Sequence, residues 1–220
     1  MLPDDDTTQT ADQDSPTTSE IDPLSVRWVF AKKMLHSGRI RFKARLVVRG
    51  FEQRYGVNYE ETFSPTVSCA SIQTLIALTA RMRCGIHQMD VKTAFIQSTL
   101  KEKVYILPPD GFQTNAPYLR LRKALYGLKQ APRAWNDHID SKFKEFGYKR
   151  CQSDFCIYVK ESTIVALYVD DILIISDDDD AIVKTKEFLK SQFEMEDMGE
   201  VKRFLGMEIK RHANGDILIS

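Results

Sequence analysis

The sequence predicts an α+β fold with an antiparallel sheet, and three observations support this prediction. Apolar and polar residues alternate in short runs separated by turn-forming residues, as they do in paired strands. Apolar residues recur at helical spacing in longer segments between those runs. With 43% hydrophobic and 10% aromatic residues, the chain of 220 residues can also bury a substantial core.

The first half of the chain predicts a hairpin, a helix and several strands. Segments 27–35 and 39–49 alternate apolar and basic residues around His36-Ser37-Gly38, which predicts a β-hairpin. A helix over 71–83 follows from the helical spacing of its apolar face, formed by Ile72, Leu75, Ile76 and Thr79. After it we expect a strand over 85–90, a turn or short helix over 90–98, and strands over 104–107 and 118–125.

The second half predicts two more helices and the rest of the sheet. A helix over 131–146 should end at Gly147. Three strands follow over 155–160 and 164–176, and the last two of them are joined through Asp170-Asp171. A helix over 178–193 turns Ile182, Phe188 and Leu189 inward. Segment 201–219 predicts a final hairpin with its turn at Ala213-Asn214-Gly215.

Charge divides the chain into two unlike parts. The 31 Lys and Arg balance the 31 Asp and Glu, but residues 1–24 hold seven of the acids and no Lys or Arg. The remainder, 25–220, therefore carries a formal charge of +7. We expect residues 1–24 to be an acidic, disordered linker, followed by a basic body suited to a nucleic-acid partner.

Composition also excludes several classes of protein. No apolar run approaches the ~20 residues that a membrane-spanning helix needs. The start of the chain is acidic, with Asp4-Asp5-Asp6, where a secretory signal needs bases and an apolar stretch. The four cysteines form no CxxC pair and the four histidines are scattered, so we expect reduced thiols and no structural zinc site.

Two adjacent acids, Asp170 and Asp171, interrupt an otherwise apolar stretch over 167–175. A solvated turn is the simple interpretation, but Asp90 also ends an apolar strand, and adjacent central strands of one sheet would bring the three acids together. Carboxylates about 4 Å apart repel by roughly 4 kcal/mol at an effective dielectric of 20. A divalent cation such as Mg²⁺ or Mn²⁺ would make the cluster tolerable. This chemistry is typical of polymerases and nucleases.

Six stretches, in order along the chain, resemble the reverse transcriptases of Ty1/copia-type LTR retrotransposons. Tyr168-Val169-Asp170-Asp171 resembles their YxDD box, and the segment from Asp90 to Phe95 resembles the carboxylate motif that precedes it. The other four stretches are RFKARLVVRGF at 41–51, ETFSP at 61–65, LRKALYGLKQAPRAW at 121–135 and FLGMEI at 204–209.

This resemblance implies a right-hand polymerase fold over residues 25–220, with fingers, an antiparallel palm sheet, and an end before the thumb and RNase H domain. It implies an RNA-directed DNA polymerase in which two metal ions promote nucleotidyl transfer from a dNTP to a primer 3′-hydroxyl. Asp90, Asp170 and Asp171 match the catalytic metal ligands. The expected cofactor is Mg²⁺, with Mn²⁺ as the alternative.

The resemblance assigns further roles to single residues, each of which also has a structural alternative. Lys43 and Arg45 match residues that bind the dNTP phosphates, or they form a solvated basic strand face. Phe95 matches the residue beneath the nucleotide sugar, or it is a core aromatic. Gln130 resembles a residue near the nucleotide, or it begins a helix. Phe204-Leu205-Gly206 resembles the primer grip, or it is a plain turn.

The implied partners are an RNA or DNA template–primer and dNTPs, together with the integrase and RNase H domains of an intact Pol polyprotein. An intact element would place the protein in cytoplasmic virus-like particles, without a membrane partner. Two functions stay open. The three carboxylates favour an active reverse transcriptase, whereas the expected truncation favours a catalytically inactive nucleic-acid-binding remnant of a degenerate retroelement copy.

Overall fold

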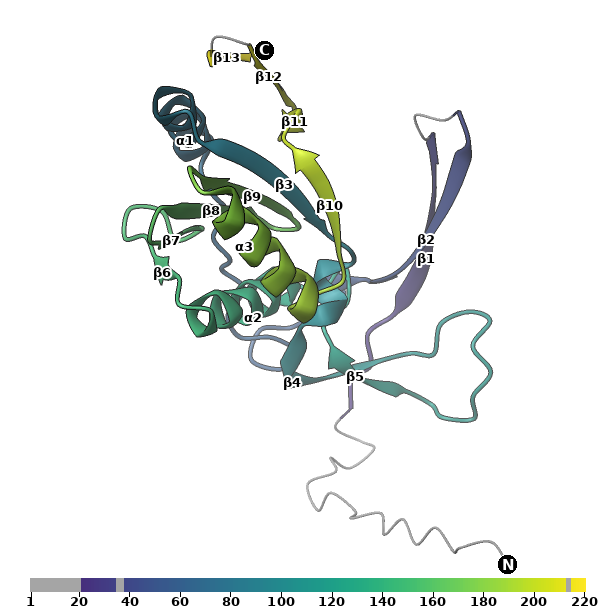
Figure 1. Cartoon of the computed structure of the whole chain (residues 1–220). Helices are drawn as coiled ribbons and strands as arrows, with labels where there is room; N and C mark the ends of the chain where they lie inside the picture. Colours follow the sequence, from purple (N-terminus) through teal and green to yellow (C-terminus); the bar gives the residue numbers. More distant parts are fainter. Residues whose placement is uncertain (1–20, 35–37, 213–214) are drawn as a thin grey trace, which may run out of the picture.

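The computed structural model describes residues 21–34, 38–212 and 215–220. Its centre is a six-stranded antiparallel sheet in the order β10-β3-β9-β8-β7-β6 (Figure 1). The bounds of these strands are β3 (Gly85–Val91), β6 (Lys149–Arg150), β7 (Ile157–Lys160), β8 (Thr163–Tyr168), β9 (Asp171–Ser176) and β10 (Met195–Glu200). The predicted α+β class with an antiparallel sheet is therefore confirmed.

Strand β3 lies inside the central sheet, between β9 and β10. Its register with β9 runs from Gly85 opposite Ser176 to Asp90 opposite Asp171. Strands β8 and β9 form a hairpin in which Tyr168 pairs with Asp171, so that only two residues connect them. Adjacent central strands thus bring Asp90 to the Asp170-Asp171 pair, as the sequence predicted.

Three α-helices pack around this sheet: α1 (Cys69–Met82), α2 (Ala131–Glu145) and α3 (Asp179–Gln192). The Ser68 side chain caps α1 by accepting a hydrogen bond from the Ser71 amide, and the predicted inward residues of this helix are all buried. Asp178 caps α3 in the same way. The Phe146 and Phe188 rings stack with centroids 4.0 Å apart, which joins the end of α2 to α3.

Strands β1 (Val26–Met34) and β2 (Ile40–Val48) form a long two-stranded hairpin that projects from the rest of the molecule (Figure 1). Because side chains alternate along a strand, Lys43 and Arg45 share one face, while Trp28, Phe30 and Phe42 lie on the other. At the base of the hairpin, the Val48 amide donates to the Tyr126 carbonyl over 2.8 Å. This bond ties the predicted basic strand to the loop that precedes α2.

Two smaller sheets complete the described part of the chain. Strands β4 (Thr99–Ile106) and β5 (Leu119–Lys123) form one, and β11 (Arg203–Phe204), β12 (Met207–Arg211) and β13 (Ile217–Ile219) form the other. Short 3₁₀ helices occupy η2 (Gly50–Glu52) and η3 (Ala94–Gln97). The η3 helix confirms the expected turn or short helix after Asp90.

Some elements differ from their predictions. Strand β10 was not predicted, because its acid-rich sequence with Gly199 has a low strand propensity; it forms because the edge of β3 offers backbone partners. Strand β6 was also missed, and β4 begins five residues before the predicted 104. The C-terminal segment was predicted as one hairpin but forms two. Strands β11 and β12 are joined by a turn at Leu205-Gly206, and β12 pairs with β13. Residues 213–214 of the predicted turn lie outside the described residues.

The predicted linker, 1–24, lies outside the described residues except for its last four. Leu24 is buried and exchanges backbone hydrogen bonds with Tyr105 and Leu107, so the folded chain begins before the predicted residue 25. Within the described ranges, no helix combines the length and apolarity required to cross a membrane. All four cysteines are free thiols.

Candidate active site

The predicted carboxylates lie where β3 ends and β9 begins, with Asp170 in the turn just before Asp171. Asp90 and Asp171 are direct partners in the strand register, so their side chains lie on the same face of the sheet. His87, three residues earlier on β3, contacts Lys186 of α3 over 2.8 Å. Because strand side chains alternate, Asp90 projects from the sheet face opposite to α3. The structure therefore brings together the acids that the sequence singled out.

Asp170 stands in the two-residue connection between β8 and β9. Its backbone carbonyl accepts a hydrogen bond from the Val91 amide over 2.8 Å, so the turn is attached to the end of β3. The preceding residue, Val169, has a φ of 55°, in the left-handed region. Its carbonyl accepts a 2.6 Å hydrogen bond from the indole Nε1 of Trp135. Because Asp170 lies in the turn while Asp171 begins β9, the turn geometry, and not strand alternation, sets the direction of the Asp170 carboxylate.

The pKa values of two of these carboxyl groups reflect their crowding. Burial raises the pKa of Asp90, and the charges of Asp170, Asp171 and Glu196 raise it further, while Lys43 opposes them. Burial also raises the pKa of Asp171, which the hydrogen bond from Gln88 partly offsets. Gln88 Nε2 lies 3.0 Å from Asp171 Oδ1. The negative charges of the carboxylates at this site therefore exceed the positive charge of the nearby side chains.

Carboxylate oxygens are the ligands that Mg²⁺ and Mn²⁺ prefer, so Asp90, Asp170 and Asp171 have the donor chemistry of a divalent cation site. Among the described ranges, no three His, Cys, Asp or Glu side chains are grouped so as to hold a metal ion as they stand. One Asp171 oxygen already accepts the hydrogen bond from Gln88. A bound cation would relieve the repulsion that raises the pKa of Asp90.

The basic face of the β1–β2 hairpin turns toward the carboxylates. Lys43 is close enough to lower the pKa of Asp90 against the effect of the neighbouring acids. The Arg45 guanidinium lies 5.3 Å from the centre of the Tyr126 ring, and its Nε is buried without a hydrogen-bond partner. A buried donor that lacks an acceptor is costly, so the position of this guanidinium carries a local energetic penalty.

Phe95 and Tyr126 form the aromatic part of the site. Phe95, in η3, is half-buried, and its ring centroid is 4.9 Å from that of Tyr126. Burial raises the pKa of the Tyr126 hydroxyl, and the charges of Asp170 and Asp90 raise it further against the opposing effect of Arg45. Tyr126 therefore links the predicted residues Phe95 and Arg45 to the carboxylates.

Gln130 does not point to the carboxylates. Its side chain is only 2% exposed, its Oε1 accepts from Gln53 over 2.9 Å, and its Nε2 donates to the Asn58 carbonyl over 2.8 Å. It precedes the first residue of α2 without a side-chain capping bond. In this structure the Gln130 amide joins α2 to loop 53–58 through a buried network, at the start of a helix as the structural alternative expected, and its place near the nucleotide stays a prediction.

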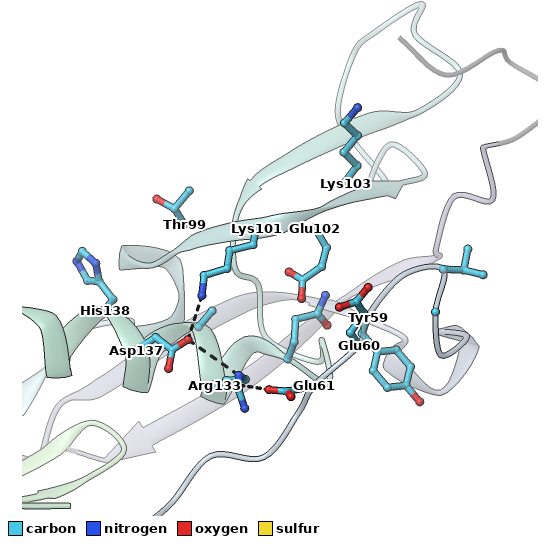
Figure 2. A pocket seen from close by; sticks show the side chains of 14 residues that line it. Tyr59, Glu60, Glu61, Thr99, Lys101, Glu102, Lys103, Arg133, Asp137 and His138 are labelled. Carbon is cyan, nitrogen blue, oxygen red and sulfur yellow. Dashed lines mark hydrogen bonds and ion pairs between the residues drawn. The ribbon is translucent and has the colours of Figure 1, made fainter. Parts of the chain in front are cut away.

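Gln130 borders a separate cavity of about 740 Å³, which none of the three carboxylates lines (Figure 2). A chain of ion pairs crosses it, because Asp137 Oδ2 lies 3.3 Å from Lys101 Nζ and 4.0 Å from Arg133 Nε. Arg133 also reaches Glu61, with 2.5 Å between Nη2 and Oε2. Figure 2 shows these groups pointing toward one another across the cavity. Paired in this way, they hold loop 56–61 against α2 and β4.

Phe204-Leu205-Gly206 forms a tight hairpin between β11 and β12. Phe204 is buried and pairs with Met207, while Leu205 and Gly206 have φ of 48° and 86°, as in a type I′ turn. The hairpin follows the end of β10 at which Glu200 pairs with His87, so it lies toward the end of β3 that is remote from Asp90. The structure gives a turn with an exposed tip at this position.

Three residues join the site without having been predicted: Gln88, Tyr126 and Glu196. Glu196 lies opposite Asp90 on β10, so Asp90 has an acid on each side. Gln88 could have been found from its spacing of two residues before Asp90 in a strand. Tyr126 stood inside a motif already singled out. Glu196 had no sequence signal, because β10 itself was not predicted.

Comparison with known proteins agrees with these motifs. Residues 14–220 match the family described as reverse transcriptase (RNA-dependent DNA polymerase). The chain is 43% identical over 198 residues to the retrovirus-related Pol polyprotein from transposon TNT 1-94 of Nicotiana tabacum, covering 86% of this chain and 15% of that protein. It is 39% identical over 208 residues to the Pol polyprotein from transposon RE1 of Arabidopsis thaliana, covering 91% and 14%. To the Ty1-LR2 Gag-Pol polyprotein of Saccharomyces cerevisiae it is 32% identical over 202 residues, covering 87% and 11%.

The chain thus spans 11 to 15% of the length of these three relatives. Among solved structures, apo telomerase from Candida tropicalis, truncated from its C-terminal domain, matches with a TM-score of 0.46 and 10% identity, covering 91% of this chain and 56% of that one.

Proposed function

Because the chain belongs to the reverse transcriptase (RNA-dependent DNA polymerase) family, in the form carried by copia-type Pol polyproteins, we propose that it is an RNA-directed DNA polymerase. It transfers a nucleotide from a dNTP to the 3′-hydroxyl of a primer on an RNA template. The central strands and their helices form the palm, and the β1–β2 hairpin belongs to the fingers. The observation that carries this proposal is the pairing of Asp90 with Asp171 beside Asp170.

Asp90, Asp170 and Asp171 would hold the divalent cations, Mg²⁺ or, in its place, Mn²⁺. Bound cations supply a nucleophile of lowered pKa and charge stabilisation at the phosphate in this class of reaction. For its part, the protein would hold the three carboxylates where β3 ends and β9 begins, and Gln88 would give up the Asp171 oxygen when a cation competes for it. The charges of Asp170, Asp171 and Glu196, which add to the effect of burial in raising the pKa of Asp90, support this assignment, because a cation would offset their repulsion.

Lys43 and Arg45 bind the phosphates of the incoming dNTP. Support comes from their common strand face and from the effect of Lys43 on the pKa of Asp90. Phe95 lies under the sugar, where its ring, backed by Tyr126, would collide with a 2′-hydroxyl. For Gln130 we propose an indirect role, in which its buried amide fixes the start of α2 and loop 53–58.

Leu205 and Gly206, at the exposed tip of the β11–β12 turn, contact the primer backbone, and the buried Phe204 anchors the turn. The nucleic-acid partner is an RNA or DNA template–primer. In an intact element, integrase and RNase H domains of the same polyprotein accompany this chain in cytoplasmic virus-like particles. The acidic segment before Leu24 acts as a linker within the polyprotein.

Primer extension on an RNA template tests the proposed function. The wild-type chain should incorporate dNTPs with Mg²⁺ or Mn²⁺, and Asp90→Asn and Asp171→Asn should each lower the rate by about 10³-fold or more, since metal catalysis supplies several kcal/mol. Asp180→Asn, an exposed acid in the first turn of α3, is the matched control and should keep wild-type activity.

The competing function predicts a different pattern. A catalytically inactive remnant would bind template–primer with a strong salt dependence and incorporate nothing with either metal. Salt-sensitive binding without incorporation by the wild-type chain would therefore replace our proposal with that one. Full activity in Asp171→Asn would instead remove the carboxylate assignment.

A further inference from the structure

The hydrogen bond between Trp135 and Val169 connects helix α2 to the residue that precedes the catalytic acids. Indole Nε1 and the Val169 carbonyl oxygen are 2.6 Å apart. Trp135 is 1% exposed, and Nε1 is the only hydrogen-bonding atom of its side chain. The single hydrogen-bond donor of this side chain therefore binds the turn that carries Asp170.

Val169 adopts a backbone conformation that its side chain disfavours. Its φ of 55° lies in the left-handed region, where a β-branched residue is an outlier because Cβ approaches the backbone. Such a conformation persists only when the surroundings hold it. The strand pairing beside the turn and the contacts made to it must therefore hold Val169 in this conformation.

The constraint comes from two sides. The Asp170 carbonyl accepts from the Val91 amide of β3 over 2.8 Å, and the Val169 carbonyl accepts from Trp135 of α2. The first bond attaches the turn to the strand that carries Asp90. The second bond comes from helix α2, and its donor is a side chain, the Trp135 indole.

Trp135 is itself held rigidly. Its ring meets that of Phe193 edge to face, with centroids 5.1 Å apart, and both side chains are buried. Trp135, Leu167 and Val169 also line a cavity of about 200 Å³ beneath the turn. The cavity leaves the turn room to relax if the indole no longer holds the carbonyl.

We infer that Trp135 is a positioning residue for the polymerase site. Its indole bond keeps Val169 left-handed and thereby sets the directions of the Asp170 and Asp171 carboxylates. This inference rests on the proposed polymerase function for its kinetic consequences, but its structural consequence does not depend on activity. The residue acts through the turn and does not touch the substrate.

The test uses Trp135→Phe, which keeps an aromatic ring and removes the donor. Hydrogen exchange measured by mass spectrometry on the peptide covering 167–172 should quicken at least about fivefold, because the turn opens more often. Phe193→Leu is the control, since it loosens the packing around the indole while the bond remains. It should lower the melting temperature and leave exchange in 167–172 near the wild-type rate. Unchanged exchange in Trp135→Phe, or equal acceleration in Phe193→Leu, would overturn the inference.

A double-mutant cycle with Val169→Gly separates positioning from packing. Glycine adopts a positive φ without strain, so the turn should depend less on the indole in that background. We expect Trp135→Phe to lower kcat about tenfold when Val169 is present and less than about threefold in the Val169→Gly background, with the dNTP KM nearly constant. Equal losses in both backgrounds would contradict positioning.

The two hypotheses fail in different ways. A wild-type chain without polymerase activity would refute the proposed function, and the exchange experiment would still decide the role of Trp135.

Discussion

Asp90 on β3 and Asp171 on β9 face each other as direct partners across two antiparallel strands. On the opposite side of Asp90, Glu196 of β10 occupies the equivalent position. Acids placed directly opposite each other in a sheet destabilise it. Where β3 ends and β9 begins, the fold therefore keeps a group of like charges that destabilises the protein without metal and that a bound cation would stabilise.

Replacing Asp90 should stabilise the metal-free protein while abolishing catalysis. Burial and the charges of Asp170, Asp171 and Glu196 raise the pKa of Asp90 above its ordinary 3.8. A carboxyl whose pKa is raised on folding destabilises the fold at neutral pH, and this penalty fades as the pH falls toward the ordinary value. Asp90→Asn should therefore raise the melting temperature at pH 7 without metal, and the gain should vanish below about pH 4.

Thermal unfolding across this pH range, with EDTA present, measures the effect. Adding Mg²⁺ should raise the melting temperature of the wild type more than that of Asp90→Asn, because the cation binds the native carboxylates. A lower melting temperature for Asp90→Asn at pH 7 would contradict the crowding of charge.

Phe95 should control the choice between dNTP and rNTP. Its ring, 4.9 Å from that of Tyr126, is backed by a second aromatic and has little room to move aside. Phe95→Val removes the collision with a 2′-hydroxyl, so discrimination against rNTPs should fall by about 10 to 200-fold, the range expected for a steric difference of this size. The ratio of kcat/KM for a dNTP and its rNTP measures it. The exposed Phe112 supplies the control variant Phe112→Val, which should leave the ratio unchanged.

Gly127 should be indispensable to the joint between the β1–β2 hairpin and the loop before α2. Its φ is 94°, and a Cβ there would overlap the Val48 carbonyl, which has no freedom to move because Val48 belongs to β2. Gly127→Ala should cost at least about 3 kcal/mol in the free energy of unfolding, since strain and overlap add. Gly111 has a similar φ of 83° with open space around it, so Gly111→Ala should cost only about 1 to 2 kcal/mol. Urea denaturation compares the two, and equal costs would argue against a close contact at Gly127.

The cluster of Lys186, His87 and Asp197 should stabilise edge strand β10. Lys186 Nζ lies 2.8 Å from His87 Nδ1 and 2.9 Å from Asp197 Oδ1. Lys186→Met should cost about 1 to 2 kcal/mol, at the low end for a charged hydrogen bond because the Asp197 side chain is 30% exposed. Lys184→Met, on the exposed face of α3, should stay within about 0.5 kcal/mol of wild type.

The same cluster predicts an acid dependence of stability. Burial would raise the pKa of Asp197, but hydrogen bonds from Lys186 and the Gly199 amide lower it to about 2. A lowered carboxyl pKa contributes stability that is complete above the ordinary 3.8 and is lost as the pH falls toward 2. The unfolding free energy of Asp197→Asn should thus change less between pH 4 and pH 2 than that of the wild type. A parallel pH profile in the two proteins would exclude this role for Asp197.

Local patterns were sufficient for many of the regular elements, but not for β6 and β10. The apolar spacing of Ile72, Leu75 and Ile76 predicted a helix, and the buried side chains of α1 confirm it. Alternation predicted the β1–β2 hairpin, and the break in an apolar run at Asp170-Asp171 predicted the turn between β8 and β9. These features depend on neighbours within one or two helical turns or one hairpin, so they can be derived from the chain alone.

Strand β10 and the environment of each site residue depend on distant partners. Met195–Glu200 has little strand propensity of its own and pairs because β3 exposes an edge, which brings Glu196 beside Asp90. Gln130, predicted at the nucleotide, is drawn into a buried network by Gln53 and Asn58, more than 70 residues away. The buried Trp135 donates its indole hydrogen bond to Val169, which lies 34 residues further along the chain. The identity of the carboxylates can be derived from the sequence because they interrupt apolar strands. Their neighbours cannot, because strand pairing and side-chain hydrogen bonds are long-range contacts that only the folded chain creates.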